Sequence, residues 1–114
     1  MIKVAFFSQD GRRTGFSVVG HSDFNAHEAG EYDVVCAGVT AIVRCVEATL
    51  NDVMGVGAKT RVEDDNENNV AAVTLKLPAK YEEEEAVQAI LDGMMLTLAS
   101  LRDENPDYIE VMEV

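Results

Sequence analysis

The stretch DVVCAGVTAIVRCVEATLNDV, residues 33–53, decides how the rest of the chain is organised. Its larger apolar residues recur at three- and four-residue spacing, which is the spacing of one helix face. They are Val39, Ile42, Val46 and Leu50. This predicts an amphipathic helix over 34–53. Asp33 is a suitable N-cap, because its carboxylate can accept hydrogen bonds from N–H groups of the first turn. Gly55 and Gly57 mark the helix end, since glycine readily takes the left-handed conformation that stops a helix.

Alternating apolar residues on the N-terminal side of this helix predict a β-hairpin. The two alternating segments, residues 2–8 and 14–20, are separated by Asp10-Gly11, a dipeptide that favours a tight hairpin turn. The polar stretch 20–32 that follows is long for a connection within a compact domain. Loops of this kind are more often functional than idle.

On the C-terminal side of the helix, strand-like alternation returns and a second helix follows. A second strand pair is predicted at 61–63 and 73–77, around a turn-rich segment. A second apolar stripe then predicts a helix whose first turn holds the four glutamates 82–85, where acidic side chains suit the positive end of the helix dipole. A last strand is predicted at 108–112.

The predicted order of elements is β-β-α-β-β-α-β, in a chain of 114 residues without a linker, repeat or low-complexity stretch. Residues 1–114 are therefore expected to form a single domain. Two helices on one face of a mixed, mostly antiparallel sheet would bury every apolar stripe in the sequence. The expected fold class is α+β, a two-layer sandwich.

The chain is strongly acidic, with 21 Asp and Glu against 9 Lys and Arg and a formal net charge of -12. Binding to nucleic acid or to an anionic membrane depends on clustered basic side chains, so neither is expected as a direct partner. A basic protein would be attracted, although solubility alone explains most of such an excess. We expect neither a secretory signal nor an apolar run of the ~18 residues that a membrane helix needs, which favours the cytoplasm.

Cys36 and His21 are the candidate reactive residues. With Asp33 as N-cap, Cys36 would be the third residue of the helix, where free N–H groups and the dipole stabilise a thiolate. His21 follows a strand and Gly20, and the loop can fold back to bring its imidazole within hydrogen-bond reach of the thiol. The pattern is typical of a cysteine nucleophile with a histidine base. The structural alternative is that Cys36 packs under the helix and that His21 is a polar residue at a strand end.

The second cysteine and the second histidine lead to other expectations. Cys45 lies among apolar residues and is expected to be buried. It follows Cys36 by nine positions on the same helix, so the two thiols point to opposite faces and do not form a disulfide. A zinc site from His21, His27 and Cys36 lacks a fourth ligand and the usual ligand spacings, so we expect no metal and no cofactor.

The sequence resembles the bacterial ribosomal-processing cysteine proteases. Their pattern is a Gly-His dipeptide, a short loop and then Asp-hydrophobic-Val-Cys-Ala at a helix start. Here the matching elements are Gly20-His21, Gly30 and DVVCA at 33–37. The order of strands and helices is similar over essentially the whole chain. The loop is a few residues longer than in that pattern, Ser22 stands in place of an alanine, and Thr40 stands in place of a serine.

The resemblance implies that Cys36 is the nucleophile and that His21 is the general base and acid, with Asp33 in or beside the site. Residues of the intervening loop, namely Gly20, Ser22 and Gly30, are assigned to substrate contact. The resemblance also implies a homodimer. The substrate it implies is the N-terminal extension of a large-subunit ribosomal protein, the one numbered twenty-seven, whose removal supports ribosome assembly.

Several roles stay open at this level. Asp33 either only caps the helix, the preferred interpretation, or also orients His21. His27 is an alternative base, but a residue at a strand end is held more firmly than one in mid-loop. Backbone N–H groups near Ala37 are the candidate oxyanion donors. Two other classes of function compete with the protease: a non-catalytic acidic dimeric adaptor that binds a basic ribosomal protein, and a redox or metal-sensing domain.

Overall fold

The computed structural model describes residues 1–21, 31–65 and 70–114, and the side chains of residues 1–20, 34–64 and 71–114. Its main elements are β1 (Ile2–Gln9), β2 (Arg12–His21), α1 (Glu31–Ala48), β3 (Lys59–Asp65), β4 (Val70–Lys76), α2 (Glu85–Glu104) and β5 (Ile109–Glu113). A π-helical turn, η2 (Thr49–Val53), continues α1, and a short 3-10 helix, η3 (Ala79–Tyr81), precedes α2. The predicted order of elements and the α+β class are confirmed.

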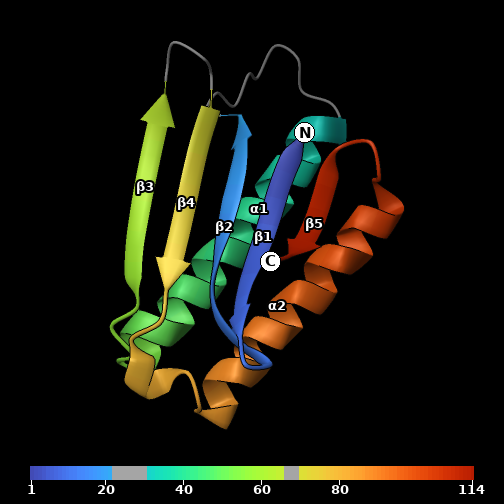
Figure 1. Cartoon of the computed structure of the whole chain (residues 1–114). Coiled ribbons are helices and arrows are strands. Elements are labelled where there is room, and N and C mark those ends of the chain that lie inside the picture. Colours follow the sequence, from blue (N-terminus) through green and yellow to red (C-terminus); the bar gives the residue numbers. More distant parts are fainter. Residues whose placement is uncertain (22–30, 66–69) are drawn as a thin grey trace.

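The strands form a five-stranded mixed sheet in the order β3-β4-β2-β1-β5, in which β1 and β5 are parallel and the other neighbours are antiparallel. Both helices cover one face of the sheet, and α1 crosses that face obliquely (Figure 1). The hairpin between β1 and β2 turns at Asp10 and Gly11, whose φ angles of 54° and 80° fit a two-residue turn with positive φ at both positions. The hairpin predicted from this dipeptide is therefore confirmed.

The hydrophobic core lies between the sheet and the two helices. Phe6 and Phe16 are cross-strand partners on its sheet side, with ring centroids 6.1 Å apart. The largest fully buried side chains are Phe6, Phe16, Leu50, Leu75, Leu91, Leu98 and Ile109. Each side chain of this size contributes ~1.5–3 kcal/mol through burial, so the helix stripes fix how α1 and α2 lie on the sheet.

Two helix starts differ from the prediction. Helix α1 begins at Glu31, so Asp33 lies within its first turn and is not the residue that precedes the helix. Helix α2 begins at Glu85 with Glu84 at the N-cap, so its first turn holds one of the four glutamates instead of all four. Acidic residues are favoured both at and just before a helix start, and the sequence alone therefore did not determine the first residue.

The end of the first helical segment agrees with the prediction. The π-helical turn reaches Val53, and Gly55 and Gly57 follow with φ angles of 68° and 71°. The backbone N–H of Val56 donates to the carbonyl of Leu50 at 2.8 Å, which closes the last turn. The glycines thus take the left-handed conformation expected of them.

The helical segment Val34–Val53 has the predicted length but is more apolar than expected. The segment has 20 residues, and the mean hydropathy of 1.5 in an 18-residue window of it is high enough for a membrane-crossing helix by length and composition alone. The expectation that no apolar run reaches this length was wrong. One side of the segment packs into the core through Val35, Val39, Val43, Val46 and Leu50. The high hydropathy of the segment therefore comes from two sets of residues: the buried core stripe, and the apolar residues on the side that faces away from the sheet.

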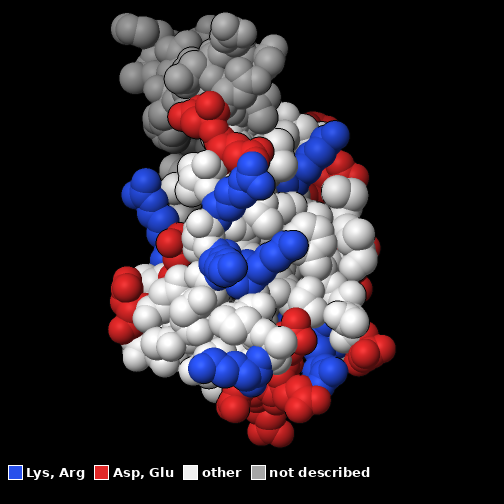
Figure 2. Space-filling view, turned by 60° about the vertical axis from the view of Figure 1, so that its left-hand side comes forward, with Lys and Arg blue, Asp and Glu red and all other residues white. Residues whose placement is uncertain are grey.

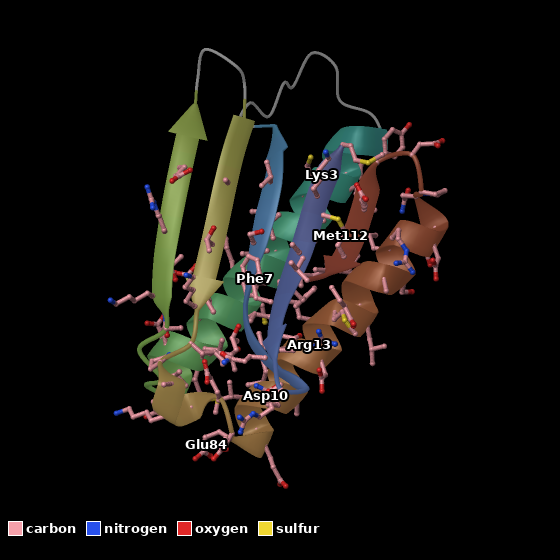
Figure 3. The ribbon with its side chains drawn as sticks, in the orientation of Figure 1. Lys3, Phe7, Asp10, Arg13, Glu84 and Met112 are labelled. Carbon is pink, nitrogen blue, oxygen red and sulfur yellow. The ribbon has the colours of Figure 1, made fainter. Side chains whose placement is uncertain are left out.

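Arg13 connects the hairpin to α2 and β5 through hydrogen bonds of its guanidinium. Its guanidinium donates to Asp92 at 2.8 Å and to Glu113 at 3.1 Å, and it lies 5.3 Å from the ring centroid of Phe6. Burial opposes the charged form of this side chain, but the hydrogen bonds to the two carboxylates outweigh that effect and raise the Arg13 pKa. Arg13 lies at the hairpin end of the sheet, where α2 begins (Figure 3).

Charge is distributed unevenly over the surface. Four of the nine Lys and Arg residues of the chain lie on the sheet face that α1 and α2 do not cover. They are Lys3, Lys59, Arg61 and Lys76. Figure 2 shows basic side chains gathered over the face on which β3 comes forward, with acidic ones toward its rim. Among the described side chains, this face therefore carries more basic than acidic residues, since only Glu63 and Glu110 accompany the four basic ones.

Candidate active site

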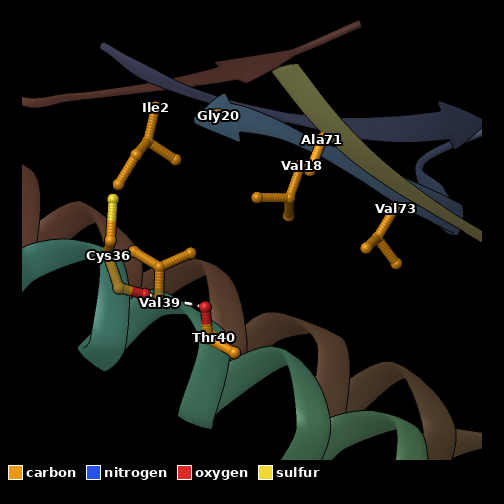
Figure 4. A pocket seen from close by; sticks show the side chains of 8 residues that line it. All are labelled: Ile2, Val18, Gly20, Cys36, Val39, Thr40, Ala71 and Val73. Carbon is orange, nitrogen blue, oxygen red and sulfur yellow. Dashed lines mark hydrogen bonds between the residues drawn. The ribbon is translucent and has the colours of Figure 1, made fainter. Parts of the chain in front are cut away.

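Cys36 lies on α1 and faces the sheet. It is half-buried and packs against the core. Figure 4 shows its Sγ atom directed from the helix toward Ile2, the first residue of β1. The thiol thus stands at the boundary between the helix layer and the sheet, in the half of the molecule where β2 ends.

A small cavity opens beside this thiol. Its volume is about 110 Å³, and it is lined by Ile2, Val18, Gly20, Cys36, Val39, Thr40, Ala71 and Val73. Apart from Cys36 and Thr40 these side chains are apolar or absent (Figure 4). A cavity of ~150 Å³ with apolar walls can hold a benzene ring, so this one accommodates about one apolar side chain of a ligand.

His21 is the last residue of β2 and pairs with Val70 of β4. It directly follows Gly20, which lines the cavity. The backbone therefore brings His21 to the same end of the sheet as Cys36. Hydrogen-bond reach between the two side chains stays a prediction. The His21 side chain lies outside the described residues. Gly20 belongs to strand β2, as the predicted strand over 14–20 has it, and it lines the cavity; its contact with substrate stays a prediction.

The remaining predicted residues of the 20–33 region are placed only in part. Ser22, His27 and Gly30 lie outside the described residues. The backbone of Asp33 lies in the first turn of α1, one turn before Cys36 on the chain. Its side chain is not among those described, so the choice between capping the helix and orienting His21 stays a prediction.

The earlier start of α1 changes the electrostatic argument for Cys36. Cys36 is the sixth helical residue instead of the third. Within an α-helix the N–H of residue i bonds to the carbonyl four residues earlier, so the N–H of Ala37 is directed to the carbonyl of Asp33. An oxyanion donor among the N–H groups near Ala37 stays a prediction, and it would require this N–H to serve two acceptors. The helix dipole also weakens beyond the first turn, so a thiolate at Cys36 would depend more on a neighbouring imidazolium than one at the third helical position.

Thr40 contributes a contact that sequence reasoning missed. Its hydroxyl donates to the carbonyl of Cys36 at 2.8 Å, across one helical turn, while its side chain lines the cavity. The cavity residues on the strands were missed as well: Ile2, Val18, Ala71 and Val73. Strand alternation could have shown that they face the helices. It could not have shown that they meet Cys36, because the pairing of β2 with β4 is not encoded locally.

Cys45 is exposed, so the prediction that it is buried was wrong. The reason is in the helix geometry itself: nine positions at ~100° each turn the side chain to the opposite side of α1 from Cys36. Since Cys36 faces the sheet, Cys45 faces away from it. Among the described side chains, no group of three or more His, Cys, Asp or Glu residues could hold a metal ion.

The chain matches one family model over nearly its full length. The model, described as cysteine protease Prp, covers residues 1–110. No curated protein matches the chain.

Solved structures share the fold at low sequence identity. The crystal structure of SMU.848 from Streptococcus mutans has a TM-score of 0.79 and 19% identity, covering 100% of this chain and 94% of that chain. The ribosomal processing protease Prp from S. aureus, crystallised with a covalently linked product peptide, has a TM-score of 0.72 and 20% identity over 100% of both chains. The same S. aureus protein with a substrate peptide has a TM-score of 0.72 and 19% identity, again over 100% of both chains.

Proposed function

Because the chain belongs to the cysteine protease Prp family, we propose that it is an endopeptidase that removes the N-terminal extension of a ribosomal protein. The observation that carries the proposal is Cys36 beside an apolar cavity, at the end of the sheet where β2 ends in His21. We further propose that the substrate is the large-subunit protein numbered twenty-seven and that cleavage supports ribosome assembly in the cytoplasm. The S. aureus relative with the same fold is named as a ribosomal processing protease.

Cys36 and His21 act in this proposal as a catalytic dyad. His21 takes the thiol proton, and the Cys36 sulfur attacks the scissile carbonyl carbon to form a tetrahedral intermediate. The C–N bond then breaks as His21 returns the proton to the leaving amine, which leaves a thioester on Cys36. Water, deprotonated by His21, hydrolyses the thioester and regenerates the thiol. Asp33 caps the first turn or orients His21.

The cavity and the surface charge support a substrate of this kind. An apolar side chain next to the scissile bond fills the cavity and brings its carbonyl to the Cys36 sulfur. A ribosomal protein is basic, and the net charge of -12 attracts it. Because the basic residues gather on the open sheet face, this attraction acts mainly toward the other surfaces of the molecule. No direct contact with nucleic acid or membrane is part of the proposal.

The direct experiment is cleavage of the precursor by the purified protein under reducing conditions. The expected product is a single mature ribosomal protein, whose new N-terminus is identified by mass spectrometry. A precursor that stays intact at enzyme concentrations equal to its own contradicts the proposed function.

We also propose a homodimer that forms through the outer side of α1. Val34 and Val53, near the two ends of the segment, are 72% and 79% exposed. The exposed residues between them are mostly small or apolar, and include Ala37, Ala41, Cys45 and Ala48. Small side chains let two helices approach closely, and an apolar side of this length is rarely left in water.

Ala41→Glu is expected to convert the dimer into a monomer. A carboxylate at the centre of the helix pair would be desolvated without a partner, so the dissociation constant should rise by about 10²-fold or more. Sedimentation velocity over a range of concentrations measures this. Ala89→Glu, at an exposed alanine of α2, is the matched control and should leave the sedimentation unchanged. If both variants sediment like the parent protein, α1 does not form the interface.

A further inference from the structure

Val62 of β3 is an exposed apolar side chain on the side of the sheet that the helices cover. It pairs in register with Val73 of β4, and directly paired residues of neighbouring strands carry their side chains on the same face. Val73 lines the cavity beside Cys36. Val62 therefore lies on the face that holds the core, yet 67% of its surface is exposed.

The oblique path of α1 explains this exposure. The helix approaches β3 near the start of that strand and moves away from it toward the other end (Figure 1). Thr60 is accordingly half-buried, whereas Val62 and Asp64, further along the same side of β3, are exposed. The helix layer thus ends before it reaches Val62, and the apolar wall formed by Val18 and Val73 continues onto an uncovered valine.

This geometry makes Val62 the outer part of a continuous apolar surface that begins at Cys36. Neighbouring strands lie ~4.8 Å apart, so Val62 is one strand spacing beyond Val73. The cavity itself, at about 110 Å³, has room for about one side chain. Strand β3 is also the outermost strand of the described sheet, so a ligand in the cavity can leave it along Val62 without meeting another strand.

We propose that Val62 is a specificity-determining residue, which together with Val73 binds a second apolar side chain of the peptide substrate. The proposal rests on the proposed protease function. In an extended peptide, alternate side chains lie on the same face and are ~6.6 Å apart, and Val62 lies one strand spacing beyond Val73 of the cavity wall, so a peptide with one side chain in the cavity reaches Val62 with a second one. The preferred substrate therefore has two apolar residues within three positions of each other, one in the cavity and one against Val62.

The test uses a peptide that spans the cleavage junction, together with variants in which each of the four residues before and after the scissile bond is replaced by alanine. Val62→Thr keeps the shape and the β-branched side chain but makes it polar. It is expected to raise KM for the parent peptide about fivefold at unchanged kcat, because the lost contact is made in the bound complex. In one peptide of the series, alanine replaces the side chain that contacts Val62. With that peptide, Val62→Thr should change KM less than about 1.5-fold.

Val114→Thr is the matched control. Val114 is 70% exposed and follows β5, at the opposite edge of the sheet, so this variant should behave like the parent protein with every peptide. If the parent protein cleaves the peptide and Val62→Thr shows the same KM across the whole series, the role of Val62 is refuted while the protease function stands. If the parent protein cleaves neither the precursor nor the peptide, the proposed function fails first.

Discussion

Cys36→Ala is expected to lower the rate of precursor cleavage by about 10⁴-fold or more, because it removes the atom that attacks the scissile carbonyl. Cys45→Ala is expected to retain cleavage within about twofold. Its thiol is exposed on the opposite side of α1 from the cavity. Removing the Cys45 sulfur therefore leaves the contacts of the site unchanged. Cleavage is measured by gel shift of the precursor and by mass spectrometry of the product.

Cys36→Ser separates loss of chemistry from loss of packing. Cys36 packs against the core, so alanine at this position leaves a small void, whereas serine nearly preserves the shape. Both variants should unfold within a few degrees of the parent protein, and both should lack activity. Equal loss of cleavage in the Cys36 and Cys45 variants would contradict the assignment of the nucleophile. Full cleavage by Cys36→Ala would exclude a cysteine mechanism, and an effect on ribosome assembly without any cleavage would favour the adaptor.

His21→Ala is expected to lower kcat by about 10²–10⁴-fold, the usual contribution of a positioned general acid and base. His27→Ala should leave kcat within about threefold. The proton acceptor must be held to within ~0.5 Å of its productive position, and His21 is anchored by its backbone pairing at the end of β2. Gly20, the residue before His21, lines the Cys36 cavity, so the end of β2 lies beside the site.

Alkylation of Cys36 gives a second, independent measure of the same pairing. An imidazolium next to a thiol stabilises the thiolate, so His21→Ala should slow modification by iodoacetamide at neutral pH and move its onset to higher pH. His27→Ala should be modified like the parent protein. Cys45→Ala is the suitable background for the measurement, because the exposed Cys45 would otherwise react as well. If the two histidine variants behave the other way round, His27 is the base.

The sequence by itself determined the elements and their order. Helical spacing at Val39, Ile42, Val46 and Leu50, alternation around Asp10-Gly11 and the glycines at 55 and 57 are local signals, each readable within a short window. They predicted the α+β sandwich and the hairpin, and they located Cys36 on a helix and His21 at a strand end. Two local features were judged wrongly: the start of each helix, where acidic residues are equally suitable on either side of the boundary, and the apolar character of Val34–Val53.

The tertiary structure decided what surrounds Cys36. The pairing of β2 with β4 brings Val18 and Val73 together, and the oblique packing of α1 sets Cys36 against Ile2 while it leaves Val62 uncovered. It also decided which side of α1 faces the sheet, and therefore that Cys45, on the other side, is exposed. These features depend on contacts between residues far apart in the chain, whose free energy comes from burial between whole layers. No short stretch of sequence contains that information, because a strand carries the same alternation whichever strand it pairs with.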